Sequence, residues 1–157
     1  MAVEKYTALA NITLTSSASS VTFGSIPSGY RDLRVVCKVT SATDSGIRLR
    51  FNSDTGSNYS YVGAGGNGTS AIPASGTASW VLTSFSNYTN LFTIAQIMDY
   101  SATDKHKTVL TRGESAGEYA TMLANRWANT AAITSVTVLS DEAAWAIGST
   151  FELYGVK

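Results

Sequence analysis

Apolar and polar residues alternate along most of this chain, and this pattern constrains the fold more than any other feature. The run DLRVVCKVT (residues 32–40) has an apolar residue at nearly every second position, and GIRLRFN (46–52) repeats the pattern. A period of two residues is typical of strands that bury one face and expose the other. The two runs therefore predict strands whose arginines and lysines point away from the core.

Similar runs recur to the end of the chain, separated by turns rich in Gly, Ser, Asn and Asp. The best helical candidate, MLANRWANTAA (122–132), contains threonine and leads into TSVTVLS, which favours a strand. We therefore predict an all-β protein, an antiparallel, jelly-roll-like β-sandwich of about 8–10 strands in one domain over residues 1–157. The Gly-rich stretch 63–76 is predicted to be an internal loop.

Charge and cysteine content exclude several classes of protein. Eleven basic and eleven acidic residues give zero formal net charge, so no nucleic-acid partner is expected. Because Cys37 is the only cysteine, an intrachain disulfide is excluded. Cys37 occupies one of the alternating apolar positions of the run 32–40, which predicts that it is buried. No run approaches the roughly 20 apolar residues of a membrane span, and the first residues lack the pattern of a secretory signal.

The polar centre NSDTGS (52–57) resembles a calcium loop at first sight. With Asn52 at the first position of an EF-hand, Asp54 takes the third, but the fifth falls on Gly56 and the twelfth on Gly63. Neither glycine has a side chain to bind calcium, so an EF-hand is excluded. A polar turn explains the residues, and a looser site built from backbone carbonyls stays an alternative.

The remaining motifs do not predict an enzyme, a metal site or a cofactor. GAGGNG (63–68) matches the letters of a dinucleotide loop, but Pro73 and Gly76 follow where its helix should run. The only histidine, His106, is predicted to be a solvated residue at the start of a strand, and no nucleophile motif accompanies it.

Two groups of carboxylates are candidates for glycan hydrolysis, which needs a pair of acids across a cleft. They are Asp141 with Glu142 and, more loosely, Glu114 with Glu118. Both lie in turn-like segments without an evident aromatic platform, so hydrolysis is a rival rather than the expected function.

Aromatic residues near loops are the candidate contact residues. Tyr59, Tyr61 and Tyr88 lie beside turns and are expected to be exposed. Tyrosine is enriched at protein interfaces and also stacks on sugars, so these rings would serve either a protein interface or a glycan site.

Four phrases together resemble a family of small bacteriophage virion structural proteins. They span nearly the whole chain and are IPSGYRDLRVV (26–36), LRFNSDTGSNYSY (49–61), IMDYSATDKHKTVLTRGES (97–115) and STFELYGVK (149–157). None of them contains a catalytic motif.

This resemblance implies a jelly-roll-like β-sandwich on the surface of a phage particle. The implied function is a non-enzymatic capsid decoration or cement protein that oligomerises, commonly as a homotrimer, and binds the major capsid protein or other virion proteins. The alternative is a tail-fibre or receptor-binding module that recognises a host-surface glycan.

Overall fold

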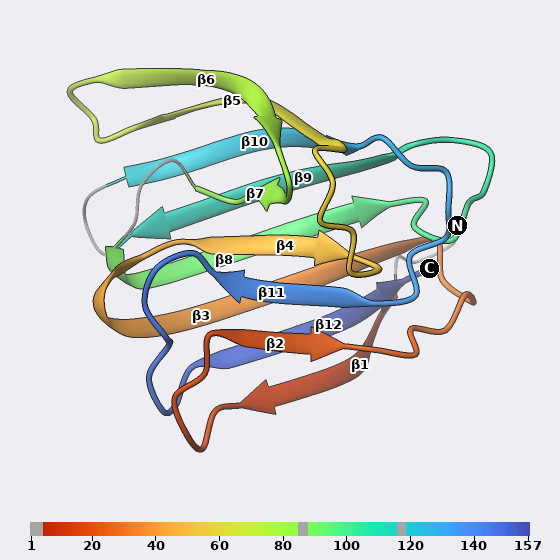
Figure 1. Cartoon of the computed structure of the whole chain (residues 1–157), viewed down its shortest axis with the longest axis horizontal. Coiled ribbons are helices and arrows are strands. Elements are labelled where there is room, and N and C mark those ends of the chain that lie inside the picture. The colour runs from red at the N-terminus through yellow and green to blue at the C-terminus, as the bar shows by residue number, and fades with distance from the viewer. Residues whose placement is uncertain (1–4, 85–87, 116–118) are drawn as a thin grey trace.

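The computed structural model describes residues 5–84, 88–115 and 119–157, and this part of the chain is built from β-strands (Figure 1). It contains no helix long and apolar enough to cross a membrane. The twelve strands are β1 (Tyr6–Thr13), β2 (Ser20–Phe23), β3 (Asp32–Ser45), β4 (Ile47–Phe51), β5 (Tyr59–Gly66), β6 (Ala71–Ala78), β7 (Val81–Leu82), β8 (Tyr88–Met98), β9 (Lys107–Ser115), β10 (Tyr119–Trp127), β11 (Val136–Ser140) and β12 (Thr150–Val156).

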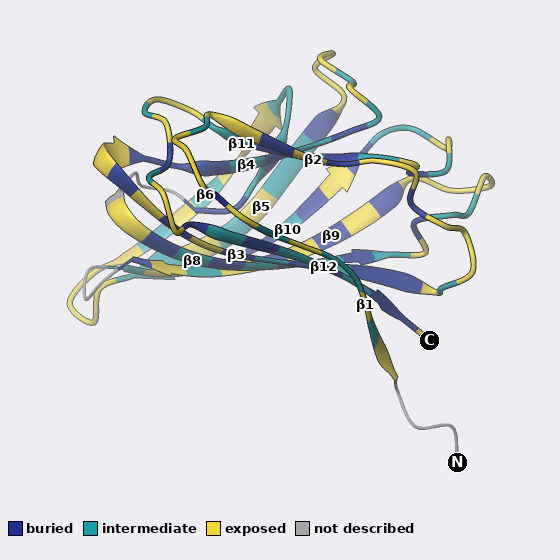
Figure 2. Ribbon diagram, turned by 90° about the horizontal axis from the view of Figure 1, so that it is seen from below, coloured by how far each residue is buried: buried dark blue, intermediate teal, exposed yellow. Residues whose placement is uncertain are grey.

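The strands form two antiparallel sheets that pack face to face, as the sequence predicted. The large sheet has eight strands in the order β1-β12-β3-β8-β9-β10-β5-β6, and the small sheet has four in the order β2-β11-β4-β7. Figure 2 shows the small sheet lying against one side of the large sheet only. The predicted β-sandwich is therefore confirmed.

Eight of the strands have the connectivity of a jelly roll. Four antiparallel pairs are nested along the chain, β1 with β12, β2 with β11, β3 with β8 and β4 with β7. The pairs alternate between the two sheets, and β12 also pairs with β3 while β11 pairs with β4. This is the arrangement produced when a long antiparallel ribbon wraps around a core.

The other four strands widen the large sheet beyond the jelly roll. β9 and β10 add to the edge at β8, and the β5–β6 hairpin then adds to β10. These strands raise the count from the predicted 8–10 to twelve in the described part of the chain.

The prediction of a loop over residues 63–76 is wrong, because β5 and β6 occupy most of this stretch. Two of the glycines in this stretch lie close to atoms of the neighbouring strand, one to backbone and one to a side chain. A Cβ atom at Gly63 would lie 2.3 Å from the carbonyl oxygen of Met122, and one at Gly76 would lie 2.8 Å from the hydroxyl of Tyr61. Such close approach selects glycine and removes the apolar alternation that would have indicated a strand.

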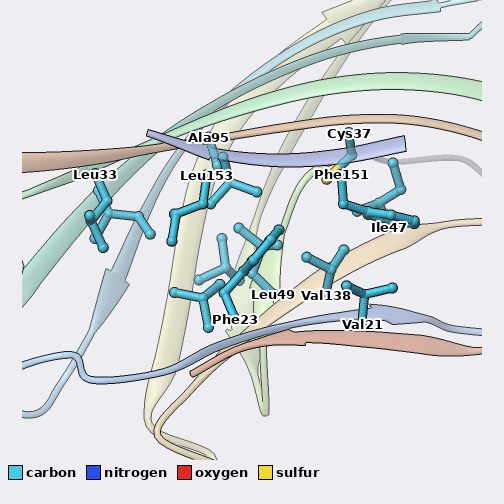
Figure 3. Packing of buried hydrophobic residues seen from close by; sticks show 14 of the residues in the cluster. Val21, Phe23, Leu33, Cys37, Ile47, Leu49, Ala95, Val138, Phe151 and Leu153 are labelled. Carbon is cyan, nitrogen blue, oxygen red and sulfur yellow. The ribbon is translucent and has the colours of Figure 1, made fainter. Parts of the chain in front are cut away.

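The core lies between the two sheets and follows the predicted alternation. In β3, Leu33, Val35, Cys37 and Val39 are buried, and their neighbours on the other side are more exposed. Figure 3 shows large-sheet residues such as Phe151 and Leu153 facing small-sheet residues such as Leu49 and Val138. Burial of this apolar surface is the main force that holds the sheets together.

Side chains of the large sheet hold the short edge strand β7 in place. Asn125 of β10 accepts a hydrogen bond from the backbone N–H of Leu82 and donates one to its carbonyl, at 2.9 and 3.1 Å. Thr111 also donates to that carbonyl, and Thr121 donates to the carbonyl of Thr83. Backbone groups at the edge of the small sheet are thus satisfied from the opposite layer, which protects the edge from pairing with other chains.

Candidate functional site

The polar loop between β4 and β5 is held together by the carboxylate of Asp54. This carboxylate accepts hydrogen bonds from the indole Nε1 of Trp127 at 2.7 Å, from the side-chain amide of Asn58 at 2.9 and 3.1 Å, and from the backbone N–H of Gly56 at 2.9 Å. Burial alone would raise the pKa of Asp54, but these hydrogen bonds outweigh it and lower the pKa below its usual value. The carboxylate therefore serves as an internal clamp.

The same loop turns through two residues in the left-handed backbone region. Asn52 and Ser53 have φ angles of 50° and 58°. The side chain of Asn52 accepts hydrogen bonds from the backbone N–H groups of Thr134 and Ser135 and donates one to the carbonyl of Ala132. The loop is therefore tied to the segment before β11, which explains why asparagine occupies this turn.

These contacts favour a structural role for the loop over cation binding. Both oxygens of Asp54 and the side-chain oxygen of Asn52 already accept hydrogen bonds from the protein itself. Among the residues that the structure describes, no three His, Cys, Asp or Glu side chains group as metal ligands. The loop is thus the polar turn expected from its sequence.

The expectation of an exposed ring is wrong for Tyr59. Its side chain is 1% exposed and packs beside Phe51 and Trp127, with ring centroids 6.1 and 6.3 Å away. Its hydroxyl accepts a hydrogen bond from the backbone N–H of Phe51 at 3.1 Å, and burial raises its pKa to about 12. The alternating pattern of β5 continues through Tyr59, and this places the ring in the core.

Tyr61 and Tyr88 have different positions. Tyr61 is half-buried, and its ring lies over Gly76 of the neighbouring strand β6. Tyr88 begins β8 and is paired with Ser45, but its side chain lies outside the described part of the chain. The structure therefore brings no two of the three tyrosines together as an exposed aromatic platform in its described part.

Of the carboxylates considered for hydrolysis, Asp141 and Glu142 are neighbours in the turn after β11. Asp141 follows β11 and binds the Arg48 guanidinium and the backbone N–H of Gly46. Glu114 projects from β9 in the large sheet, and Glu118 lies outside the described residues. His106 is exposed directly before β9, as predicted. The Asp141 carboxylate is thus occupied by partners within the protein, and the structure does not describe the grouping of Glu114 with Glu118.

The largest candidate contact surface is the outer side of the eight-stranded sheet, which we call the open face. The small sheet covers the other side, and no element in the described part of the chain covers this one (Figure 2). Large apolar side chains are nevertheless exposed here, with Met122 at 69%, Val62 at 59% and Leu110 at 44%. Contiguous exposed apolar side chains on a sheet are typical of interaction surfaces.

Strand register defines how the open face is arranged. One row across four strands reads Arg112 (β9), Ile94 (β8), Val36 (β3) and Glu152 (β12), because each residue is paired with the next. The adjacent row reads Leu110, Gln96, Arg34 and Tyr154 on the same strands. Both rows continue onto β10 and β5, where Met122, Ala64, Ala124 and Val62 are apolar or small.

A shallow hollow of about 250 Å³ lies at the centre of the open face. Its lining includes Tyr6, Arg34, Ile94, Leu110, Arg112 and Met122. The guanidinium of Arg34 stacks over the ring of Tyr6, 5.3 Å from its centroid, which holds this charge beside the apolar residues. The hollow therefore combines apolar walls with two cations.

Charges of both signs surround these apolar residues. Arg34, Lys38, Arg112 and Arg126 provide positive charge, and Glu114 and Glu152 provide negative charge. The hydroxyl of Tyr154 donates to Glu152 at 2.5 Å, and this hydrogen bond raises the pKa of Tyr154 above its usual value. The open face thus suits a partner that offers apolar surface together with both charges.

Sequence reasoning did not identify the open face as a site. The alternation in β8 and β9 correctly predicts which residues point outward, but register between strands distant in sequence is needed to place them in rows. The signal in the sequence was the presence of apolar residues, such as Val36, Leu110 and Met122, at outward positions of the alternation.

Comparison with known proteins assigns no family. A scan against models of known protein families finds no match, and a search of curated proteins finds no significantly similar sequence.

Proposed function

We propose that this protein is a non-enzymatic structural component of a bacteriophage virion, a decoration protein that assembles on the outer surface of the capsid. The single observation that supports this most is the open face, where Met122, Val62 and Leu110 are exposed on a broad sheet. An exposed surface of this kind loses unfavourable contact with water when another protein covers it.

The phrases that resemble phage virion proteins support the same proposal. They form strands and corners of the jelly roll: one leads into β3, one joins β4 to β5 through the Asp54 clamp, one joins β8 to β9 and the last forms β12. A rigid sandwich held by such corners suits a protein that must keep its shape within an assembly.

The mechanism is stabilisation by mass action. A protein that binds the assembled shell, and not its separated subunits, shifts the equilibrium toward the shell by an amount set by its concentration and affinity. Zero net charge suits this role, since many copies can pack side by side with little long-range repulsion.

The glycan-binding alternative has less support. It depended on exposed rings at Tyr59, Tyr61 and Tyr88, but Tyr59 is buried and one side of Tyr61 is covered by β6. Sugar recognition needs free aromatic faces beside hydrogen-bonding groups. We therefore favour the decoration role over the fibre role.

Location within the particle tests the proposal. Purified virions of the phage that encodes this chain would be separated into heads and tails, and each fraction examined by peptide mass spectrometry. The proposal predicts many copies in the head fraction, and particles lacking the protein should release DNA at a lower temperature. Detection in tails alone, or absence from the particle, would contradict the decoration role.

A further inference from the structure

We propose that a second copy of this chain covers the open face, and that the two copies are related by a two-fold axis running along the strands between β8 and β3. This proposal rests on the proposed function in that it names a partner for the same surface. It replaces the trimer implied by the family resemblance with a closed pair for this contact.

The row of Arg112, Ile94, Val36 and Glu152 is the first reason for choosing a second copy. Read across the sheet, its chemistry is cation, apolar, apolar and anion. When a second copy is turned over about the middle of this row, Arg112 faces the second copy's Glu152 and Ile94 faces the second copy's Val36. A two-fold axis makes each such contact twice.

The adjacent row gives the same result with different residues. About the same axis, Leu110 faces the second copy's Tyr154, and Gln96 faces the second copy's Arg34. On the strands beside them, Ala124 of β10 faces Ala8 of β1. Each of the two rows therefore matches the same row of the second copy about one axis. A surface that binds an unrelated protein would not need this property.

The available area is sufficient for a stable pair. About this axis the six strands from β10 to β1 overlap with their counterparts, and six strands at about 4.8 Å spacing cover about 29 Å. Strands of about eight residues are about 27 Å long, which gives roughly 800 Å² on each copy. This equals the area that each partner buries in a typical specific complex.

Sheet packing sets how closely the rows can match. Facing sheets usually cross at about −30° because each sheet is twisted. The match is therefore best near the axis, where Ile94 and Val36 meet, and looser toward Met122 at the rim. In the row of Arg112, Ile94, Val36 and Glu152, the apolar residues lie at the centre and the charges farther out, which is the usual anatomy of a protein interface.

The mass of the purified chain in solution is the first test. Light scattering and sedimentation over about 1 to 100 µM should show a pair of about 33 kDa, twice the chain mass of 16.5 kDa. A single-chain mass at the highest concentration, or a trimer, would overturn the proposal. Either result would leave the virion location to be decided by its own test.

A charge exchange tests the axis itself. Arg112→Glu places two like charges together at each Arg112–Glu152 contact and should weaken the pair at least tenfold, as should Glu152→Arg. The double variant Arg112→Glu/Glu152→Arg restores both contacts and should recover most of the affinity. Within one chain Arg112 and Glu152 are three strands, or about 14 Å, apart. The effects of the two substitutions on the stability of a single chain would therefore add, and the double variant would show no recovery.

Lys105→Glu is the matched control, since it makes the same change of charge in the turn before β9 at an exposed ion pair with Asp99. It should leave the pair intact. Thermal unfolding of each variant shows whether the fold survives. A pair that Arg112→Glu does not weaken, or a double variant that is weaker than either single variant, would overturn the proposed axis.

Discussion

The indole Nε1 of Trp127, at the end of β10, donates a 2.7 Å hydrogen bond to the carboxylate of Asp54, which lies 73 residues earlier in the loop after β4. This contact joins the widened part of the large sheet to a corner of the small sheet. The Trp127 ring also contacts Phe51 edge-on, with centroids 5.5 Å apart. The polar loop is therefore part of how the two sheets are held together.

Removal of this carboxylate should destabilise the fold. Asp54→Ala leaves the buried Trp127 indole without its acceptor and also removes the acceptor of the exposed Asn58 amide. A buried donor that loses a charged partner costs about 1–3 kcal/mol. We expect the free energy of unfolding in urea to fall by about 2–3 kcal/mol. Asp44→Ala, at an exposed position in β3, is the control and should change it by less than about 0.5 kcal/mol. Equal effects of the two substitutions would contradict the clamp.

The clamp also predicts how stability responds to acid. Because the folded state lowers the pKa of Asp54, its contribution is fully present above the unfolded value of about 3.9 and is lost as pH falls through the lower folded value. In Asp54→Asn, the free energy of unfolding should therefore fall less steeply with decreasing pH below about pH 4 than in the wild type. Unfolding monitored by tryptophan fluorescence from pH 2 to 6 measures this pH dependence. The same pH dependence in the variant and the wild type would contradict the clamp.

Cys37 predicts the opposite behaviour in alkali. Burial, with a smaller effect from Glu152, raises the pKa of the thiol far above its ordinary value of 9.0. The unfolded chain ionises first, so stability is complete below pH 9 and falls by about 1.4 kcal/mol per pH unit above it. Cys37→Ala should lower stability at neutral pH but remove this slope between pH 9 and 10. A slope equal to that of the wild type would show that another group is responsible.

Much of the sandwich could be predicted from local pattern, whereas its pairing could not. The alternation in β3 correctly places Leu33 and Val35 inside, because a strand's period is a local property. The contacts that complete the fold join distant residues, such as Asp54 and Trp127, and no local pattern encodes them. Tyr59 shows the same limit, since proximity to a turn did not reveal a buried ring.

Lys107 is a further case in which local pattern was insufficient. It is fully buried, and its ammonium group donates to the carbonyls of Lys105 and Thr130 at 3.0 and 3.2 Å. Burial lowers its pKa. A run of polar residues such as DKHK normally predicts a solvated turn, and the second acceptor, the Thr130 carbonyl, comes from segment 128–133, which packs against this turn.

The glycines of the β5–β6 hairpin provide a test of packing. Gly63→Ala would place a methyl group 2.3 Å from the Met122 carbonyl and 2.8 Å from the Cα atom of Leu123, so the ladder between β5 and β10 must shift. We expect a loss of about 1–3 kcal/mol in unfolding free energy. Gly24→Ala, where no atom lies within 4 Å of the added carbon, should be nearly neutral. Equal stability of the two variants would contradict the close packing of this hairpin.

Labelling of Met122 in intact virions tests the central claim most directly. Methionine is readily oxidised when exposed, and Met122 is 69% exposed in the isolated chain. Purified particles and protein diluted below the concentration at which two copies pair would be treated with the same dose of hydroxyl radicals and analysed by peptide mass spectrometry. The account predicts that peptides of this chain are present in the particle and that Met122 there is oxidised several times more slowly than in dilute protein. Absence of the chain from the particle, or equal oxidation of Met122 in both samples, would contradict it.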